Sequence, residues 1–309
     1  MTTRPLRLGT RASALARWQA DWVAAALRAQ GRQVELVPIS TRGDTERSVA
    51  IGQLGSPGVF TKELQRALLE ERIDLAVHSL KDLPTEPVEG LALCAVPERE
   101  SPRDALVSRQ GLALASLPAG AKVGTGSLRR RAQLLHARSD LDVQGVRGNV
   151  DTRLEKLAAG EYDALVLAHA GLKRLGREAA ITELLSPEVM LPAVGQGALG
   201  IETRREDAAT REALAPLDHE PTHAACRAER TLLFALNGGC LAPIGAWARP
   251  NDEGKLFLQA VVLSADGQQR LTADGVAALD EAVDLGQQVA KRLIADGALE
   301  LIRQSRSSD

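Results

Sequence analysis

The chain has 309 residues, of which 44% are hydrophobic and 25% are charged, and its formal net charge is −2. This balance is typical of a folded globular protein and excludes a disordered or collagen-like chain. Aromatic residues are scarce, with three Trp, one Tyr and three Phe, so we expect no platform for stacking nucleic-acid bases. Without a global positive charge, we expect no binding to nucleic acid or to an acidic membrane surface.

The cysteine content and the apolar runs indicate a cellular location. Cys94, Cys226 and Cys240 are an odd number at wide separations, which argues against a disulfide framework and against a C-x-x-C metal pair. No apolar run approaches the ~18 residues of a membrane span. The first residues, Met1–Arg7, contain no apolar signal core. We therefore expect a protein of the reducing cytoplasm.

Strand-like and helix-like segments alternate along the first two thirds of the chain. We expect strands at 6–10, 33–40, 73–78, 122–124, 141–146 and 162–168, and helices at 13–30, 59–70, 128–138 and 150–159. Such alternation is typical of βαβ units, in which helices cover mainly parallel sheets.

Pro- and Gly-containing stretches at 97–103, 186–197 and 216–221 interrupt this alternation. After the last of them we expect a long helix to Leu236, strands at 256–263 and 271–273, and a final helix of about 20 residues from Val276. The pattern predicts an α/β protein with two lobes joined by two crossings and a smaller C-terminal α+β module.

Two short motifs match known site patterns only in their letters. Residues 195–200 read G-x-G-x-x-G, but a Pro-containing linker precedes them and a strand-like stretch follows, whereas a dinucleotide site needs a strand before and a helix after. Residues 219–223 read H-E-x-x-H, but Pro221 is tolerated only in a first helical turn, so His219 is expected to precede the helix. We expect neither a nucleotide site nor a metal site.

Arginines gather in the turns between expected strands and helices. These turns are 10–13, with Ser13 as helix cap, 125–131 and 147–153, while Arg174 closes a fourth segment. Because such turns meet at the carboxyl edge of a parallel sheet, they place helix N-termini and guanidiniums together. Residues 127–153 contain six Arg against three Asp. Solvated surface charge is the usual explanation of a single Arg, but the repeated chemistry favours a cleft for a polyanion.

Two further residues are unusual in these surroundings. Asp82 follows the strand 73–78, at the edge where the arginines gather, and would repel an anion unless the ligand also carries or develops positive charge. A salt bridge to Lys81 or to an arginine is an equally simple interpretation. Cys240 follows Gly238 and Gly239 in a loop, which indicates a possible nucleophile, although a buried inert thiol is the common fate of a cysteine.

Taken together, these residues resemble the porphobilinogen deaminase (hydroxymethylbilane synthase) family, with the match running from Leu6 to the final helix. The segments that carry it are Thr10–Ser13, Thr41–Asp44, His78–Pro84, Ser101–Ala105, Gly124–Arg130, Arg147–Asn149, Leu191–Gly197 and Gly238–Cys240. The chain departs from the family at Pro57 and Gln53, where loop lysines occur, and at Gly126, where Ser is common.

The resemblance implies two lobes like those of periplasmic binding proteins and a third domain. Lobe 1 would comprise residues 1–97 and 197–217, lobe 2 residues 101–192, and the C-terminal domain residues 220–309. It also implies a dipyrromethane cofactor attached to Cys240 through a thioether. A monomeric enzyme would join four porphobilinogen molecules head to tail, release ammonia and deliver hydroxymethylbilane.

The resemblance further implies roles for individual residues. Asp82 would be catalytic, facing the pyrrole N–H groups and stabilising the cationic azafulvene. The cofactor would be held by Cys240, Ser79, Lys81, Thr125, Ser127, Arg129 and Arg130. Substrate and the growing chain would contact Arg11, Ser13, Arg147, Arg153 and Arg174. The alternatives are a two-lobed polycarboxylate-binding module without catalysis, which leaves Asp82 and Cys240 unexplained, and an enzyme acting on another polycarboxylate.

Overall fold

A computed structural model of the protein describes residues 4–39, 61–239 and 242–306. The chain forms two compact units, each made of two separate segments. Unit 1 comprises Met1–Arg99 and Ala198–His223, and unit 2 comprises Glu100–Gly197 and Ala224–Asp309. No helix in the described ranges is long and apolar enough to cross a membrane.

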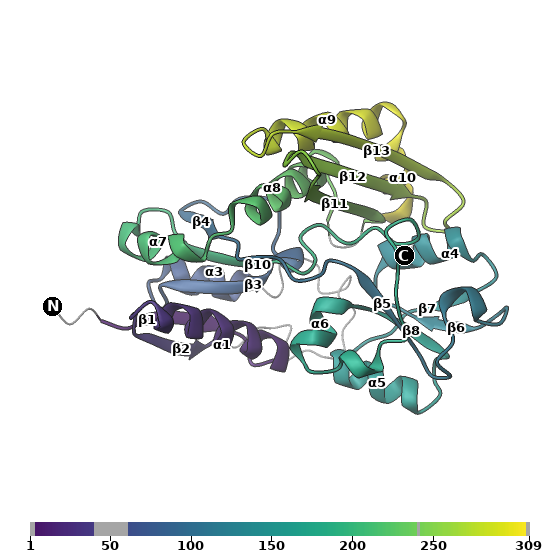
Figure 1. The fold of residues 1–309 in the computed structure, drawn as a ribbon, viewed down its shortest axis with the longest axis horizontal. Helices are drawn as coiled ribbons and strands as arrows, with labels where there is room; N and C mark the ends of the chain where they lie inside the picture. Colours follow the sequence, from purple (N-terminus) through teal and green to yellow (C-terminus); the bar gives the residue numbers. More distant parts are fainter. Residues whose placement is uncertain (1–3, 40–60, 240–241, 307–309) are drawn as a thin grey trace. The chain divides into compact units, whose positions relative to one another are not determined.

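Unit 1 contains a five-stranded sheet in the order β2-β1-β3-β10-β4 (Figure 1). Its strands are β1 (Leu6–Thr10), β2 (Val34–Pro38), β3 (Leu75–Ser79), β4 (Leu91–Ala95) and β10 (Leu199–Arg204). β1 pairs in parallel with β2 and β3, whereas β10 runs antiparallel to both β3 and β4. Helices α1 (Ala14–Ala29), α3 (Lys62–Leu69) and α7 (Ala208–Leu214) accompany it.

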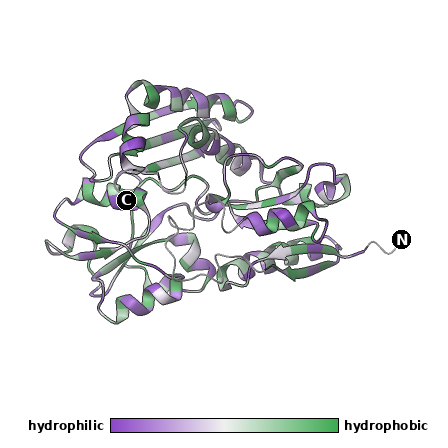
Figure 2. Ribbon diagram, turned by 180° about the vertical axis from the view of Figure 1, so that it is seen from behind, coloured by the Kyte–Doolittle hydropathy of each residue, from purple (hydrophilic) through white to green (hydrophobic). Residues whose placement is uncertain are grey.

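Alternation along β3 explains why helices cover both faces of this sheet. Leu75 and Val77 belong to the apolar cluster that contains α1, while Ala76 belongs to the cluster that contains α3. Successive side chains of a strand point to opposite faces, so a strand without polar alternation is buried on both. Figure 2 shows hydrophobic residues concentrated in the strands, with hydrophobic and hydrophilic residues alternating along the helices.

Unit 2 repeats this topology in its own five-stranded sheet, in the order β7-β6-β8-β5-β9. Its strands are β5 (Asp104–Ser108), β6 (Lys122–Gly124), β7 (Asp142–Gln144), β8 (Ala164–Ala168) and β9 (Glu183–Leu184). Here β6 pairs in parallel with β7 and β8, and β5 runs antiparallel to β8 and β9. Its helices are α4 (Leu128–Ala137), α5 (Val150–Ala158) and α6 (His169–Arg174).

The sheets are therefore mixed, with four strands in one direction and one reversed in each. The expectation of an α/β protein with mainly parallel sheets is confirmed. The reversed strands, β10 and β5, are the first strands formed after the chain enters each unit from the other. Because β5 is reversed, its first residue, Asp104, lies level with Ala168 at the carboxyl end of β8.

The C-terminal part of unit 2 is an antiparallel sheet with helices, as expected for an α+β module. β11 (Ile244–Pro250), β12 (Leu256–Leu263) and β13 (Arg270–Ala277) pair in chain order, and α8 (Glu220–Ala235) precedes them. The expected single final helix from Val276 is wrong. Val276 lies in β13, which extends well past the expected strand 271–273.

Two helices, α9 (Ala282–Ala295) and α10 (Ala298–Arg306), replace the expected single one. The break falls at Gly297, whose φ of 98° lies in the left-handed region that ends helices. The extra length of β13 escaped the sequence pattern because its side chains alternate only between half-buried and exposed, so its apolar signal is weak.

Candidate active site

In unit 1, the carboxyl edge of the sheet brings together the turns that follow β1 and β3. The Ser13 Oγ accepts a hydrogen bond from the Ala16 backbone N–H at 3.3 Å and caps α1 as expected. Arg11 is half-buried in the same turn. Because β1 and β3 are parallel neighbours, this turn lies on the same edge as the segment that follows β3.

That segment is a short 3-10 helix, η1 (Leu80–Asp82), directly after Ser79. The buried amide of Gln19 on α1 donates a 2.7 Å hydrogen bond to the Ser79 Oγ and holds it in place. Leu80 is fully buried and anchors the turn, which leaves Lys81 half-buried and Asp82 exposed. Among the described residues, no ion pair joins Asp82 to Lys81 or to an arginine.

Behind this edge, His78 is buried in β3, as expected of a packed histidine. Its Nε2 lies 3.0 Å from an Oε2 of Glu202 on β10, and the Gln65 amide donates to the same carboxylate at 3.2 Å. No local pattern predicts this cluster, because its three members are far apart in the sequence. They meet because β10 pairs with β3, with Gly200 opposite His78.

In unit 2, two helix-capping turns follow the same plan. The Ser127 Oγ accepts a 3.5 Å bond from the Arg130 N–H at the start of α4, and the Asn149 side chain caps α5 through the Thr152 N–H at 2.9 Å. Thr125 is buried, and its Oγ1 accepts from the Ser127 N–H at 3.2 Å. These caps direct the N-termini of α4 and α5 toward the carboxyl ends of β6 and β7.

Arg129 and Arg130 point into the interior of unit 2, where they are 4% and 6% exposed. Both form ion pairs with the fully buried carboxylate of Asp104, at 2.8 Å and 2.7 Å. The sequence analysis missed Asp104 as their partner. A signal was present, because an aspartate that opens the apolar strand Asp104–Ser108 needs a buried cation.

Arg153 and Arg147 supply positive charge without a carboxylate. The Arg153 Nε donates to the Gly148 carbonyl at 2.8 Å, and a Cβ at Gly126 would lie 3.9 Å from its Nη2. Burial, together with repulsion from Arg130 and Arg147, lowers the pKa of Arg153 to about 10. Neither Arg147 nor Arg153 forms an ion pair within the described part of the chain.

Arg174 ends α6 and donates from Nη2 to the Gly197 carbonyl at 2.7 Å. Burial lowers the pKa of its guanidinium, and the carboxylate of Glu100 offsets part of this effect. Like Arg153, Arg174 is a half-buried cation that would gain from a nearby anion.

A buried donor at the start of α4 lacks an acceptor in the part of the chain that the structure describes. The Arg129 Nε is buried and has no hydrogen-bond partner among the described residues. Burial lowers the pKa of the Arg129 guanidinium, and Asp104 only partly compensates. Several buried or half-buried guanidiniums are balanced here, in the described ranges, by a single protein carboxylate, that of Asp104. The remaining positive charge suits a ligand that carries carboxylates.

Comparison with known proteins settles which family has this arrangement. The family model described as "Porphobilinogen deaminase, dipyromethane cofactor binding domain" matches residues 6–212, and "Porphobilinogen deaminase, C-terminal domain" matches residues 223–295. This chain belongs to the porphobilinogen deaminase family. The porphobilinogen deaminase of Desulforudis audaxviator (strain MP104C) is 52% identical over 306 residues, which cover 98% of this chain and 99% of that protein. The activity of the family is that of hydroxymethylbilane synthase, a transferase.

Solved structures of periplasmic binding proteins are also similar to this chain. An arginine-specific one from Salmonella typhimurium has a TM-score of 0.41 and 17% identity, covering 70% of this chain and 92% of that one. A periplasmic substrate-binding protein of an ABC transporter from Coxiella burnetii has a TM-score of 0.43 and 15% identity, covering 69% and 91%. The family assignment rests on the sequence matches alone.

The carboxylates of the family's dipyrromethane cofactor need cationic hydrogen-bond donors, and the guanidiniums of unit 2 fit that need. The buried Arg129 Nε lacks an acceptor, and Arg153 lacks a counter-charge in the described ranges. The expected attachment residue, Cys240, lies outside the described residues, as do Gln53 and Pro57. The preceding helix α8 ends at Ala235, and Asn237, two residues later, adopts a left-handed φ of 49°.

The two described cysteines are poor nucleophiles. Cys226 is fully buried in α8, and Cys94 is half-buried in β4, where burial raises the pKa of its thiol. A raised pKa leaves little thiolate at neutral pH, and the thiolate is the reactive form.

The two motifs set aside from the sequence are explained by their surroundings. His219 precedes α8 and its Nδ1 contacts the Thr222 Oγ1 at 2.8 Å, while the Nδ1 of His223 lies 2.8 Å from Asp218. No group of three His, Cys, Asp or Glu side chains in the described ranges is placed to hold a metal. The Gly-rich run 195–200 passes directly into β10 rather than into a helix.

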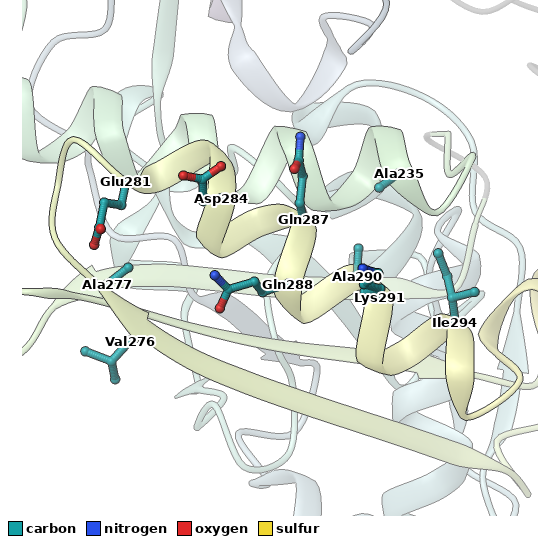
Figure 3. Close-up of a pocket in the computed structure, with 10 residues that line it drawn as sticks. All are labelled: Ala235, Val276, Ala277, Glu281, Asp284, Gln287, Gln288, Ala290, Lys291 and Ile294. Atoms are coloured by element: carbon teal, nitrogen blue, oxygen red, sulfur yellow. The ribbon is translucent and has the colours of Figure 1, made fainter.

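A surface hollow of about 490 Å³ lies elsewhere in unit 2, along α9 and β13 (Figure 3). Its charged lining residues are Glu281, Asp284 and Lys291. Two carboxylates against one ammonium would repel a polycarboxylate. This hollow contains none of the expected site residues.

Proposed function

We propose that this chain joins four porphobilinogen molecules head to tail into hydroxymethylbilane, with release of ammonia, on a dipyrromethane cofactor linked to Cys240 by a thioether. The observation that carries the proposal is the surplus of guanidiniums around Asp104 in unit 2. Each pyrrole of the substrate brings an acetate and a propionate, so binding requires such a surplus. A non-catalytic polycarboxylate-binding module and an enzyme acting on another polycarboxylate are less well supported, given the family.

We propose the following division of the site residues. The cofactor is held by Cys240, Ser79, Lys81, Thr125, Ser127, Arg129 and Arg130. Substrate and elongating chain contact Arg11, Ser13, Arg147, Arg153 and Arg174. The capped starts of α4 and α5 support these roles, because backbone N–H groups and guanidiniums occur there together.

Asp82 is the proposed catalytic residue. Loss of ammonia from the aminomethyl group of porphobilinogen leaves a cationic azafulvene, and a carboxylate facing its N–H stabilises that charge. When bound, the cofactor supplies the terminal pyrrole to which the first unit is joined. Asp82 is exposed on η1 and forms no ion pair with a described residue, so its carboxylate is available to substrate and to a departing proton.

The cellular location, the oligomeric state and the domain boundaries are also proposals. We propose that the protein acts in the cytoplasm and as a monomer. The division into lobe 1 (1–97 and 197–217), lobe 2 (101–192) and a C-terminal domain (220–309) is supported by the separate match of the C-terminal family model from residue 223.

The mass of the intact protein tests the proposal. The parent should carry the mass of two linked pyrrole units, and Cys240→Ala should fold, lack this mass and be inactive. Cys94→Ala is the matched control and should keep both the mass and the activity. An unchanged adduct in Cys240→Ala would move the attachment to another residue. A parent that gains no adduct from porphobilinogen would overturn the proposed function.

A further inference from the structure

The Asp104 carboxylate is the centre of a buried polar network in unit 2. Its Oδ2 accepts from the Arg129 Nη1 at 2.8 Å, and its Oδ1 accepts from the Arg130 Nε at 2.9 Å. The Gln196 amide also donates to Oδ1, at 2.8 Å. Asp104 is fully buried, so this one side chain determines where both guanidiniums lie.

The two arginines are held at further points by backbone carbonyls. The Arg129 Nη1 also donates to the Leu191 carbonyl at 2.6 Å, and the Arg130 Nη1 donates to the Val166 carbonyl at 3.0 Å. After these contacts the buried Arg129 Nε still has no hydrogen-bond partner in the described ranges. The network therefore fixes the direction in which that N–H points.

Gln196 orients Asp104 in turn. Besides its bond to Asp104, its Nε2 donates to the Pro102 carbonyl at 2.7 Å, and its Oε1 lies 3.5 Å from the Arg130 Nη2. The amide therefore presents its donor to the carboxylate and its acceptor to the guanidinium. Gln196 belongs to the Gly-rich run 195–200, which this role explains.

We propose that Asp104 is a positioning residue for cofactor assembly, which holds Arg129 and Arg130 in the orientation that receives a carboxylate of the dipyrromethane, with Gln196 as its support. This inference rests on the proposed function. A buried cluster of two guanidiniums and one carboxylate keeps a net positive charge. Asp104 therefore fixes the orientation of both arginines without neutralising the site.

The carboxylate stays ionised over the working range of pH. Burial by itself would raise the pKa of Asp104, but the guanidiniums of Arg129 and Arg130 hold it well below its ordinary value. The orientation of the arginines is therefore permanent rather than switched by protonation.

Asp74 of unit 1 provides a matched control. Its side chain is 2% exposed, and it pairs with Arg7 at 2.8 Å and with Arg4 at 2.9 Å. It immediately precedes β3, at the end of the strand opposite to Ser79 and Asp82. Asp74→Asn and Asp104→Asn both remove a buried charge that is paired with arginines, but only the second touches the proposed cofactor residues.

The test uses the full-length chain, prepared in cells that make no porphobilinogen and then incubated with graded porphobilinogen. Intact mass gives the fraction of protein carrying the adduct, and thermal unfolding gives the stability of each variant. We expect Asp104→Asn to raise the porphobilinogen concentration for half-maximal adduct formation at least tenfold. In Asp74→Asn this concentration should stay within twofold of the parent value, even if the melting temperature falls as much as in Asp104→Asn.

A second variant covers the case in which Asp104→Asn does not fold. Gln196→Met keeps the volume and both ion pairs but removes the support of Oδ1, and it should raise the half-maximal concentration about threefold. Unchanged or tighter adduct formation in the folded variants would overturn the positioning role, as would equal shifts in Asp104→Asn and Asp74→Asn. If the parent itself acquires no adduct, the proposed function fails rather than this inference.

Discussion

Replacement of Arg153 by Met should stabilise the cofactor-free protein while weakening its catalysis. Arg153 is half-buried near Arg130 and Arg147, and burial with this repulsion lowers the pKa of its guanidinium to about 10. Its folded pKa lies below its unfolded pKa, so the charge opposes folding at full strength below pH 10. The free-energy cost of this charge to folding falls as the pH rises above 10 and the folded protein loses the proton.

The magnitude follows from this pKa. A tenfold change in an ionisation equilibrium corresponds to about 1.4 kcal/mol, so the charge costs at most about 3 kcal/mol at pH 7, less after screening by solvent. Met also loses the hydrogen bond to the Gly148 carbonyl, worth about 1 kcal/mol. The net gain is about 1–2 kcal/mol, which corresponds to a rise in Tm of about 2–8 °C.

Thermal and urea unfolding of the cofactor-free protein measure this gain, and porphobilinogen consumption measures the loss of function. We expect kcat/KM to fall about 10–100-fold, because a charge-assisted hydrogen bond is worth roughly 1.5–3 kcal/mol. Arg131→Met is the matched control, since Arg131 is exposed on α4, and it should leave the Tm unchanged. A clear loss of stability in Arg153→Met would refute the idea that this guanidinium awaits an anion.

Three further predictions concern other charged residues. Asp82→Asn should keep the adduct and the fold but lower turnover by about two or more orders of magnitude; near-normal turnover measured by porphobilinogen consumption would make Asp82 a surface charge. Burial by itself would raise the pKa of Asp74, but its hydrogen bonds to Arg7 and the charge of Arg4 lower it to about 2. The ionised carboxylate therefore contributes about 2–3 kcal/mol to the free energy of unfolding above pH 4, and this contribution is lost as the pH falls through 2. Asp74→Asn should thus cost that amount in urea unfolding at pH 7 and almost nothing near pH 2, and a pH-independent difference would contradict the assignment. Arg11→Gln should keep the adduct but stall elongation, which mass spectra after a short porphobilinogen pulse would show as partial chains; a ladder identical to that of the parent would remove Arg11 from the substrate contacts.

Features that depend on residues close in the chain could be predicted from the sequence. The alternation of strands and helices, and the cap at Ser13, follow from local patterns because a cap needs only an N–H three residues along the chain. The motifs also indicated the family. The limits of this reasoning appear at β13, whose weak alternation concealed a full strand.

The direction of the strands and the partners of the buried charges could not be predicted from the sequence, because they depend on which elements pack together. Nothing local in the sequence reverses β5, yet its reversal carries Asp104 to the carboxyl edge, where it meets Arg129 and Arg130 from 25 and 26 residues away. The sequence therefore suggested two arginines facing a ligand, whereas the fold first pairs them with a protein carboxylate. Such pairings depend on which strands become neighbours, because a buried ion pair forms only where the packing of the whole sheet brings opposite charges together.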